Sequence, residues 1–432
     1  MSPLRPAHGA AAKPGVPAFA RPRALAAVLL AVAAWLLAFA APSPAAAAPP
    51  RISAPSAIVV EISTGDVAYA RRPDDPRPIA SVTKLMTALL TLEGRELSAK
   101  VRATRYAAAS VESQLGLRPG ERLTVADMLR GLLLVSANDV AASLAEDVAG
   151  SRGAFVRQMN RRAAALGLRR TRFEDPIGLG EDDRSTAREL VTLTLALRRF
   201  PFFKRTVDRA GLTLKSGDHP RAIVNRNSLV RQFRQVSGVK TGHTSKAGYV
   251  LVGSARRRGI TLVSVVLGAP SEAARNADTM ALLRYGFSKF SRRLAVRRGT
   301  VLDSVPIRYR RGAELDLVAA RSVRRVVRRG VRPVVKAVSV PEEVEGPIRR
   351  GQKLGRADVL VRGRKVESVA LLAAASVPEA GVTAQAKNWI TKPLGFVGVL
   401  LLVTGTVGLV LRRRGAGGDR AAKKSGRGVE AA

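Results

Sequence analysis

The stretch Pro78-Ile79-Ala80-Ser81-Val82-Thr83-Lys84-Leu85-Met86-Thr87-Ala88-Leu89 decides how this chain folds and what chemistry it can carry. Its leucines recur at helical spacing, so Ser81 to Leu92 is predicted to be a helix with one buried face. On such a helix Ser81 and Lys84 lie about one turn apart on the same face. A serine hydroxyl is a weak nucleophile near neutral pH, and a partly desolvated lysine can serve as its base.

The same S-x-x-K spacing occurs a second time, at Ser237 to Lys240. That segment is strand-like and interrupted by glycine, and residues three apart on a strand point to opposite faces. Ser81 and Lys84 are therefore the candidate nucleophile and base.

A second motif, Ser136-Ala137-Asn138, follows the apolar helical stretch Met128 to Val135. Taken alone, such a serine is more often a helix cap than a functional group. Beside a serine–lysine pair, the Ser136 hydroxyl can pass a proton to a leaving amine. Asn138 can hold a substrate amide and the Lys84 ammonium.

A third motif, Lys240-Thr241-Gly242, is expected to open a strand, with His243 directly after it. A lysine there is commonly no more than an exposed edge residue. A fixed ammonium and a hydroxyl can also bind the free carboxylate of a peptide end. Gly242 would let a substrate backbone approach the strand with no Cβ in the way.

Composition excludes several other chemistries. The 432 residues contain no cysteine, so there is no disulfide framework, thiolate zinc site or cysteine nucleophile. The three histidines, His8, His219 and His243, argue against a His-built metal site or a Ser-His-Asp triad. No G-x-S-x-G motif is present.

Two apolar segments predict how the chain is placed in a membrane. Arg21 and Arg23, the apolar run Ala24 to Ala41 and the small residues Ala45 to Ala48 describe a signal peptide over residues 1–48. The alternative is a retained N-terminal anchor, which N-terminal sequencing of the mature protein would reveal.

The second segment, Pro393 to Leu411, carries no charge and is predicted to be a transmembrane helix. Three arginines follow it and begin a basic tail over 412–432, which the positive-inside rule assigns to the cytoplasm. We therefore expect a protein of the cell membrane whose body lies on the extracytoplasmic side of a C-terminal anchor.

Between these segments two folded parts are expected. In residues 55–291, strand patterns at both ends enclose mostly helical sequence from Leu123 to Phe200, which predicts one sheet flanked by helices in an α/β (α+β) fold. The strands and closing helix are expected at Ala57–Ile62, Val67–Ala70, Tyr249–Ser254, Ile260–Gly268 and Glu272–Phe290. Residues 300–378 are predicted to form a small β-rich domain, and residues 379–392 a linker. The strands of the β-rich domain are expected at Val305–Tyr309, Glu314–Val318, Val334–Val338 and Ala357–Val361.

In this order, the three motifs resemble the active site of penicillin-binding proteins and serine β-lactamases. The sequence around Ser81 resembles serine-type D-alanyl-D-alanine carboxypeptidases, the low-molecular-mass penicillin-binding proteins. Further matching stretches are Gly238–Thr244, Lys246–Tyr249, Asn225–Leu229 and Ser185–Leu190. The resemblance runs from about Pro55 to Val377, because Pro347 to Ala374 resembles the β-rich C-terminal domain of that family.

The resemblance implies an antiparallel sheet flanked by helices and assigns roles to residues. Ser81 would be acylated and Lys84 would be its base, while Ser136 and Asn138 assist. Substrate binding would involve Lys240, Thr241, Gly242 and His243, with the backbone N–H groups of Ser81 and His243 forming the oxyanion hole. Arg226 and Arg275 align with arginines near the carboxylate pocket. No metal or cofactor is implied. At Asp175 to Leu179 the chain departs from the family, which often has His before the Gly.

The formal net charge of +40 would ordinarily suggest a nucleic-acid partner. The arginines are scattered, aromatic residues make up only 4%, and no nucleic-acid-binding motif accompanies them, so that partner is not expected. The densest stretch, Arg292 to Arg332, is best explained as a solvated face. The alternative is attraction to anionic wall polymer or lipid headgroups, which salt-insensitive binding to purified cell walls would contradict.

The predicted function is removal of the terminal D-alanine from peptidoglycan stem pentapeptides, with β-lactams as covalent inhibitors. A β-lactamase is the first alternative, although no E-x-x-L-N motif lies between the second and third motifs. A DD-endopeptidase on the same scaffold is the second. A catalytically inactive cell-wall-binding protein is the third, and the three intact motifs argue against it.

Overall fold

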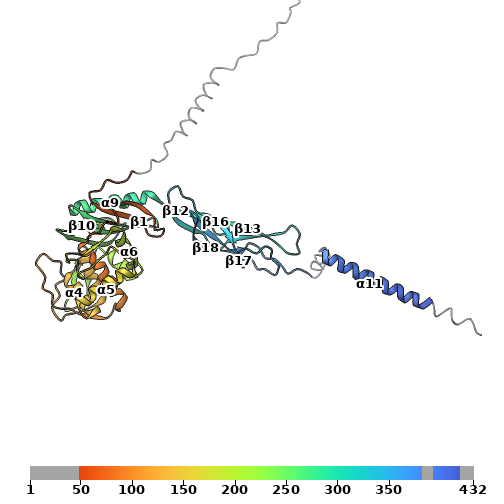
Figure 1. Ribbon diagram of the computed structural model, residues 1–432, viewed down its shortest axis with the longest axis horizontal. Helices are drawn as coiled ribbons and strands as arrows, with labels where there is room; N and C mark the ends of the chain where they lie inside the picture. Colours follow the sequence, from red (N-terminus) through yellow and green to blue (C-terminus); the bar gives the residue numbers. More distant parts are fainter. Residues whose placement is uncertain (1–47, 382–392, 419–432) are drawn as a thin grey trace, which may run out of the picture. The chain divides into compact units, whose positions relative to one another are not determined.

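The computed structural model describes residues 48–381 and 393–418 (Figure 1). The predicted signal peptide, apart from Ala48, lies outside the described residues. So do most of the predicted linker and the part of the basic tail beyond residue 418.

A five-stranded antiparallel sheet organises the first folded part, in the order β2-β1-β11-β10-β9. Its strands are β1 Ser56–Glu61, β2 Val67–Arg71, β9 Val236–Thr244, β10 Gly248–Arg257 and β11 Ile260–Ala269. The hairpins predicted at both ends of this part are confirmed. The third motif does not open its strand, however, because β9 begins at Val236 and Lys240 lies in its middle.

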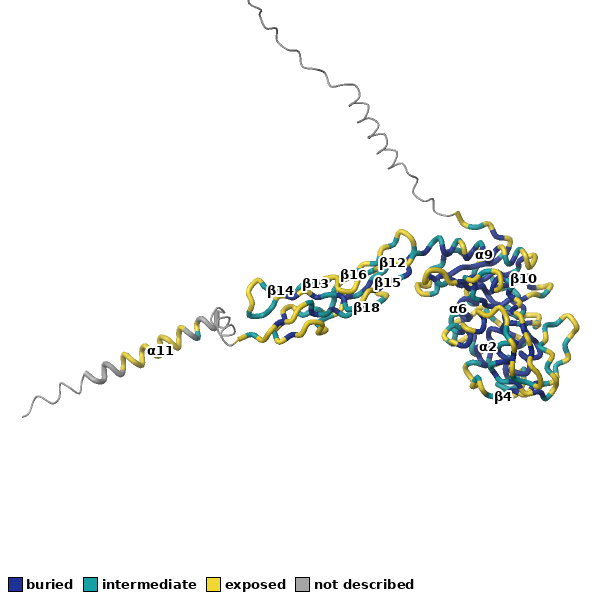
Figure 2. Tube along the Cα trace, turned by 180° about the vertical axis from the view of Figure 1, so that it is seen from behind, coloured by how far each residue is buried: buried dark blue, intermediate teal, exposed yellow. Residues whose placement is uncertain are grey.

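Helices cover both faces of this sheet, as the alternation along β1 shows. Ala57 and Val59 pack in one apolar cluster with α9 (Glu272–Lys289), while Ile58 and Val60 pack in another with the helices of the opposite face. Successive strand residues point to opposite faces, so burying both faces leaves every residue of β1 buried. Figure 2 shows the same buried layer through the sheet and α2.

The segment between β2 and β9 supplies the helices of the second face. They are α2 Lys84–Gly94, α3 Val125–Arg130, α4 Asn138–Ala149, α5 Arg152–Ala165, α6 Ala187–Leu197 and α7 Pro201–Val207. The short helix α8, Ser228–Gln232, comes from the same segment but packs in the cluster of α9. Three short antiparallel pairs brace them: β3 Arg77–Pro78 with β6 Arg184–Ser185, β4 Lys100–Arg102 with β5 Arg122–Thr124, and β7 Gly211–Leu214 with β8 Arg221–Val224. The predicted helical region is confirmed, although its break near Asp175 is longer than expected.

The second folded part is β-rich, as predicted, and has an apolar core of its own. Its five-stranded antiparallel sheet has the order β13-β14-β18-β17-β16, and β12 pairs with β15 in a separate ribbon. The strands are β12 Phe290–Val296, β13 Val301–Pro306, β14 Glu314–Ala319, β15 Val323–Arg328, β16 Val334–Val338, β17 Lys353–Val361 and β18 Arg364–Ala373.

Three of these strands, β12, β15 and β18, were not predicted, and the first strand of the sheet lies earlier than expected. In β12 and β15 arginines occupy adjacent positions, which hides the alternation that marks a strand. The strand predicted at Val305–Tyr309 was wrong in position, because β13 already ends at Pro306.

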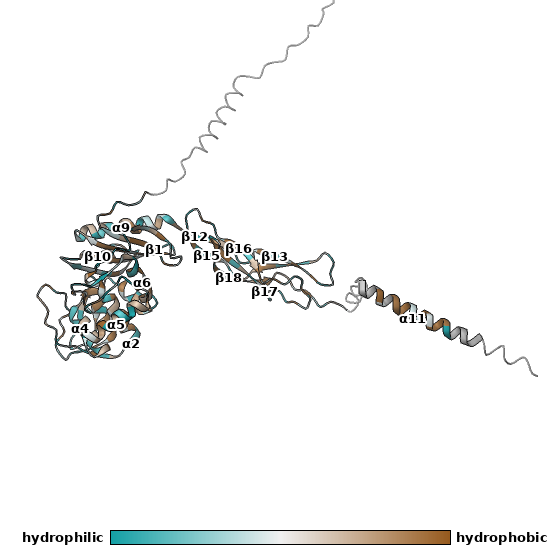
Figure 3. Cartoon of the chain, viewed as in Figure 1, coloured by the Kyte–Doolittle hydropathy of each residue, from teal (hydrophilic) through white to brown (hydrophobic). Residues whose placement is uncertain are grey.

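The last described element is the helix α11, Pro393–Gly418, whose apolar residues stand out in Figure 3. It overlaps the segment predicted to cross a membrane. Within the residues that the structure describes, no helix meets the length and hydropathy needed for a membrane span.

Candidate active site

Ser81 lies in a short 3-10 turn, Ala80–Thr83, that leads directly into α2, rather than inside the helix as predicted. Ala80, the residue before it, has a positive φ of 47°. A residue other than glycine rarely adopts this left-handed backbone, so the turn is held by its surroundings. Those surroundings present Ser81 half-buried at the N-terminal end of α2.

Lys84 is fully buried and lies directly beside the candidate nucleophile. Its Nζ is 3.0 Å from Ser81 Oγ and donates a second hydrogen bond of 2.6 Å to the carbonyl of Ile177. Burial lowers the pKa of Lys84 to about 7, against the opposing attraction of three carboxylates: Asp175, Glu112 and Asp183. A substantial fraction of the Lys84 amine is therefore neutral near pH 7 and can accept the Ser81 proton.

A loop from Asp175 to Leu179 fixes the far side of Lys84. The Asp175 carboxylate accepts backbone N–H bonds from Ile177 at 2.7 Å and from Leu179 at 2.9 Å, which closes the loop on itself. Gly178 has a φ of 95°, and a Cβ placed there would come within 2.1 Å of the Ala80 carbonyl oxygen. Loop and turn are thus in backbone contact that only glycine permits.

A buried carboxyl group, Asp183, stands next to this loop. Thr83 Oγ1 donates to it at 3.2 Å, and the backbone N–H of Glu174 donates at 2.6 Å. Burial and the neighbouring Asp175 raise the pKa of Asp183 to about 7. Its charge acts on Lys84, which titrates in the same range, so the protonation states of the two groups are linked.

The second motif lies at the start of α4, which packs against α2. A π-helical turn, Gly131–Val135, ends at Ser136, whose φ of 66° is left-handed, and α4 begins at Asn138. Both side chains are buried. Asn138 donates from Nδ2 to Glu112 Oε2 at 2.6 Å, whereas its Oδ1 is buried without a hydrogen-bond partner among the described residues. An unpaired buried acceptor of this kind is available to a ligand donor.

The third motif lies alongside Ser81, because β9 packs against the 3-10 turn. A Cβ on Gly242 would lie 3.1 Å from the backbone nitrogen of Ser81 and 3.0 Å from the carbonyl oxygen of Ile79. Thr241 is almost fully buried, and exposed His243 stacks on the Tyr249 ring with centroids 4.0 Å apart.

Lys240 is buried and donates to the carbonyl of Thr241 at 2.9 Å. Burial, followed by repulsion from Lys84, Arg226 and Arg275, holds the pKa of Lys240 well below its usual range. Arg275 is itself buried, with its guanidinium 2.6 Å from the Glu272 carboxylate, while Arg226 is exposed. Three cationic side chains therefore act on Lys240, and a bound carboxylate would relieve this repulsion.

The structure thus brings all three motifs and both arginines into one neighbourhood. Sequence reasoning missed the groups that hold them there: Glu112, Tyr106, Asp183 and the Ile177 carbonyl. These residues lie in irregular segments, and a backbone carbonyl has no signature in sequence. The one available signal was the departure at Asp175 to Leu179, which turns out to contact Lys84.

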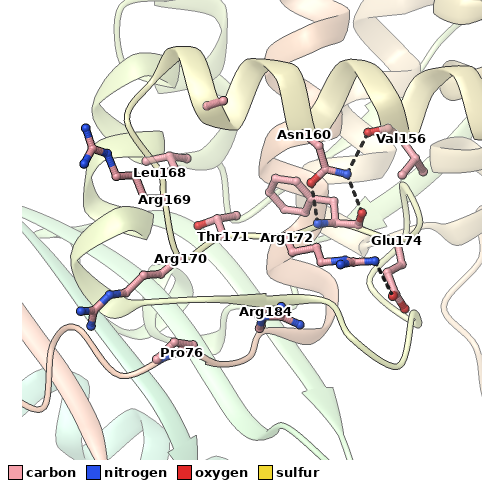
Figure 4. A pocket seen from close by; sticks show the side chains of 12 residues that line it. Pro76, Val156, Asn160, Leu168, Arg169, Arg170, Thr171, Arg172, Glu174 and Arg184 are labelled. Carbon is pink, nitrogen blue, oxygen red and sulfur yellow. Dashed lines mark hydrogen bonds and ion pairs between the residues drawn. The ribbon is translucent and has the colours of Figure 1, made fainter.

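A separate hollow of about 1030 Å³ lies on the helical side and contains none of the predicted site residues (Figure 4). Its wall carries four arginines, Arg169, Arg170, Arg172 and Arg184. Asn160 spans its back, donating to the carbonyls of Val156 at 3.2 Å and Phe173 at 2.8 Å. Glu174 on its rim precedes the loop that contacts Lys84, so the hollow adjoins the back of that loop.

Comparison with known proteins gives two family matches. The model of the family described as D-alanyl-D-alanine carboxypeptidase matches residues 43–271, and the penicillin-binding protein 5 C-terminal domain matches residues 290–379. Bacillus subtilis D-alanyl-D-alanine carboxypeptidase DacF is 32% identical over 311 residues, covering 70% of this chain and 80% of the relative.

Two further relatives agree with these matches. Escherichia coli D-alanyl-D-alanine carboxypeptidase DacA is 30% identical over 345 residues, covering 76% of this chain and 85% of the relative. The solved structure of penicillin binding protein 5 from Haemophilus influenzae superposes with a TM-score of 0.56 at 27% identity, covering 77% of this chain and all of that one.

Proposed function

From the premise that this chain belongs to the D-alanyl-D-alanine carboxypeptidase family, we propose that Ser81 is the nucleophile of a serine-type enzyme acting on peptidoglycan stem pentapeptides. The chain is a D-alanyl-D-alanine carboxypeptidase with the fold of a penicillin-binding protein. One observation carries the residue assignment: the 3.0 Å contact between Lys84 Nζ and Ser81 Oγ in a site that also holds Lys240.

In the proposed reaction, Ser81 Oγ attacks the carbonyl carbon of the penultimate D-alanine and its proton passes to Lys84. The carbonyl oxygen takes the negative charge and is stabilised by the backbone N–H groups of Ser81 and His243. The Lys84 ammonium passes this proton to Ser136, which gives its own proton to the amine of the terminal D-alanine as the C–N bond breaks and D-alanine leaves. Water then attacks the acyl-enzyme carbonyl while the neutral Lys84 accepts its proton, and Lys84 returns that proton to Ser81 Oγ as the ester bond breaks, which restores the serine hydroxyl.

In this proposal, the enzyme holds the substrate peptide by its terminal carboxylate and by a backbone amide. The terminal carboxylate would bind Lys240 and Thr241, with Arg226 and Arg275 adding positive charge around it. Asn138 Oδ1, buried and unpaired, would accept a hydrogen bond from the substrate backbone. A β-lactam, which presents a carboxylate and a strained amide in a similar arrangement, would acylate the same serine.

The purified full chain is expected to release D-alanine from a diacyl tripeptide that ends in D-alanyl-D-alanine, and to become covalently labelled by a fluorescent penicillin. Little penicillin turnover and no cleavage of a cross-linked muropeptide dimer are expected. Faster hydrolysis of penicillin than of peptide would indicate a β-lactamase, and preferred cleavage of the dimer would indicate an endopeptidase. Failure to release D-alanine, to hydrolyse penicillin and to cleave the dimer would together leave only the inactive wall-binding protein.

We also propose that α11 attaches the enzyme to the cell membrane, with the catalytic part on the extracytoplasmic side. Nine of its apolar side chains are exposed: Val397, Leu400, Leu401, Leu402, Val403, Val407, Leu409, Val410 and Leu411. Water is a poor solvent for such a surface, and a lipid bilayer is a good one.

This attachment predicts that the full chain needs detergent, and not salt, for extraction from membranes. Leu401→Arg combined with Leu409→Arg is expected to shift the protein to the soluble fraction, because a charge is costly in hydrocarbon. Val224→Arg, at an apolar residue equally exposed in the first folded part, serves as the matched control and should stay with the membrane. Equal membrane retention of the α11 variant would refute the proposal.

A further inference from the structure

We propose that Glu112 is a positioning residue that fixes the direction of the Asn138 side-chain amide, and thereby presents Oδ1 to the substrate. This inference rests on the proposed function, because it concerns how the same site holds its peptide. Glu112 lies in the irregular segment between β4 and β5, outside all three motifs.

The contact geometry leaves one orientation for the amide. Glu112 Oε2 accepts a hydrogen bond of 2.6 Å from Asn138 Nδ2 and a second, short one from the Tyr106 hydroxyl. Its Oε1 accepts from the backbone N–H of Ala109 at 3.0 Å. An ionised carboxylate only accepts hydrogen bonds, so the amide must turn its NH₂ group toward Glu112. A flipped amide would set two acceptors against each other.

The Asn138 Oδ1 atom then points away from Glu112. Asn138 Oδ1 is buried and has no hydrogen-bond partner among the described residues. The backbone of Asn138 is also fixed, since its N–H donates to the Ser113 carbonyl at 2.7 Å. Buried acceptors in native proteins are nearly always satisfied, which leaves a ligand N–H as the natural partner of Oδ1. In the proposed reaction that donor is a substrate amide.

Glu112 is itself held rigidly by Tyr106. The Arg152 guanidinium lies over the Tyr106 ring at 5.4 Å from its centroid, and Arg152 pairs with Glu146 at 3.0 Å. Burial and the adjacent carboxylate raise the pKa of the Tyr106 hydroxyl, so it remains a donor throughout the working range. The hydrogen bonds from Tyr106 and Asn138 to Glu112, together with the contacts of Arg152, therefore connect the second motif to α4 and α5.

The negative charge of Glu112 also acts on Lys84. The charged groups that act on Lys84 are Asp175, Glu112, Asp183, Arg226 and Lys240. Among them Glu112 favours the protonated amine, so its neutralisation lowers the pKa of Lys84. A variant without this charge should therefore retain activity to lower pH, which a purely structural role for Glu112 would not produce.

The test measures kcat and KM for D-alanine release as a function of pH with the full chain in detergent. Glu112→Ala is expected to lower the plateau kcat/KM by about 10- to 100-fold, by analogy with the loss when a residue that orients a metal ligand is removed. Glu112→Gln should lower it less, because one amide oxygen can still accept from Asn138, and should shift the acid limb to lower pH. Glu93→Gln, which removes the carboxylate paired with Arg162 at 2.6 Å, should match the wild type.

A double-mutant cycle shows whether Glu112 acts through Asn138. Once Asn138→Ala has removed the amide, adding Glu112→Ala should change the plateau kcat/KM by less than about twofold. Additive losses of kcat/KM in the double variant would overturn the inference, as would unchanged kinetics in Glu112→Ala. It would also be overturned if the loss of activity followed a lowered Tm and the acid limb of Glu112→Gln did not move. If the wild type itself released no D-alanine, the proposed function would fail first and this inference with it.

Discussion

Ser81→Ala is expected to take no covalent label from a fluorescent penicillin and to release D-alanine at least about a thousandfold more slowly than the wild type, as removal of a nucleophile usually does. Among the described residues, Ser81 Oγ is the one hydroxyl to which Lys84 Nζ is hydrogen-bonded. The variant should nevertheless fold normally, because the half-buried hydroxyl is exchanged for a hydrogen atom. Gel fluorescence and a D-amino-acid oxidase assay measure the two outcomes, and Tm measures folding.

Ser237→Ala is the matched control, because Ser237 is the serine of the other S-x-x-K sequence. Its Oγ donates to Ser254 Oγ at 3.2 Å within the sheet, and β9 directs Lys240 elsewhere. Label and D-alanine release should both persist in this variant. A labelled Ser81→Ala protein, or an unlabelled Ser237→Ala protein that folds, would show that the nucleophile has been assigned to the wrong serine.

Lys84→Met is expected to slow acylation by about a hundred- to ten-thousandfold, the usual contribution of a positioned general base. Methionine preserves much of the buried volume but cannot accept a proton. In the wild type, the neutral amine is the active form, so the acylation rate should fall about tenfold for each pH unit below the Lys84 pKa of about 7. Stopped-flow acylation between pH 5 and pH 9 measures this limb.

The exposed Lys100 on β4 provides the control for Lys84, and Lys100→Met should leave both the rate and its pH profile unchanged. The acid limb should disappear in Lys84→Met, leaving a slow residual rate. A wild-type rate that stays flat from pH 8 to pH 5 would mean that Lys84 is not the titrating base. An acid limb that persists in Lys84→Met would instead point to Asp183, because its pKa lies in the same range.

The sequence was sufficient to predict the strands and helices whose apolar residues recur with a regular period. Alternating apolar residues located the hairpins of the main sheet, and helical spacing located α2 and α9. The order of the three motifs was enough to predict that Ser81, Asn138 and Lys240 would meet, although more than fifty residues separate each from the next. Such predictions succeed because periodicity reflects burial, and because the chemistry of acyl transfer needs these groups together.

The remaining features depend on tertiary contacts and were not predictable from the sequence. The left-handed Ala80 has no propensity signal, since alanine favours a right-handed helix, and its conformation is imposed by neighbours. Glu112 stands in a loop whose sequence could serve as an ordinary solvated turn. Adjacent arginines concealed β12 and β15, where side-chain charge conflicts with the pattern expected for a strand. The roles assigned to the site residues stay predictions until the variants are measured.

The backbone contact between Gly178 and Ala80 has an energetic consequence for turnover. The turn that contains Ser81 becomes ordered when the protein folds. An arriving peptide therefore finds Ser81 Oγ already in place, and none of its binding energy is needed to rearrange the turn. Differences in turnover among peptides should then reflect how well each one is aligned. The enzyme would discriminate by the fit of each peptide to a fixed template.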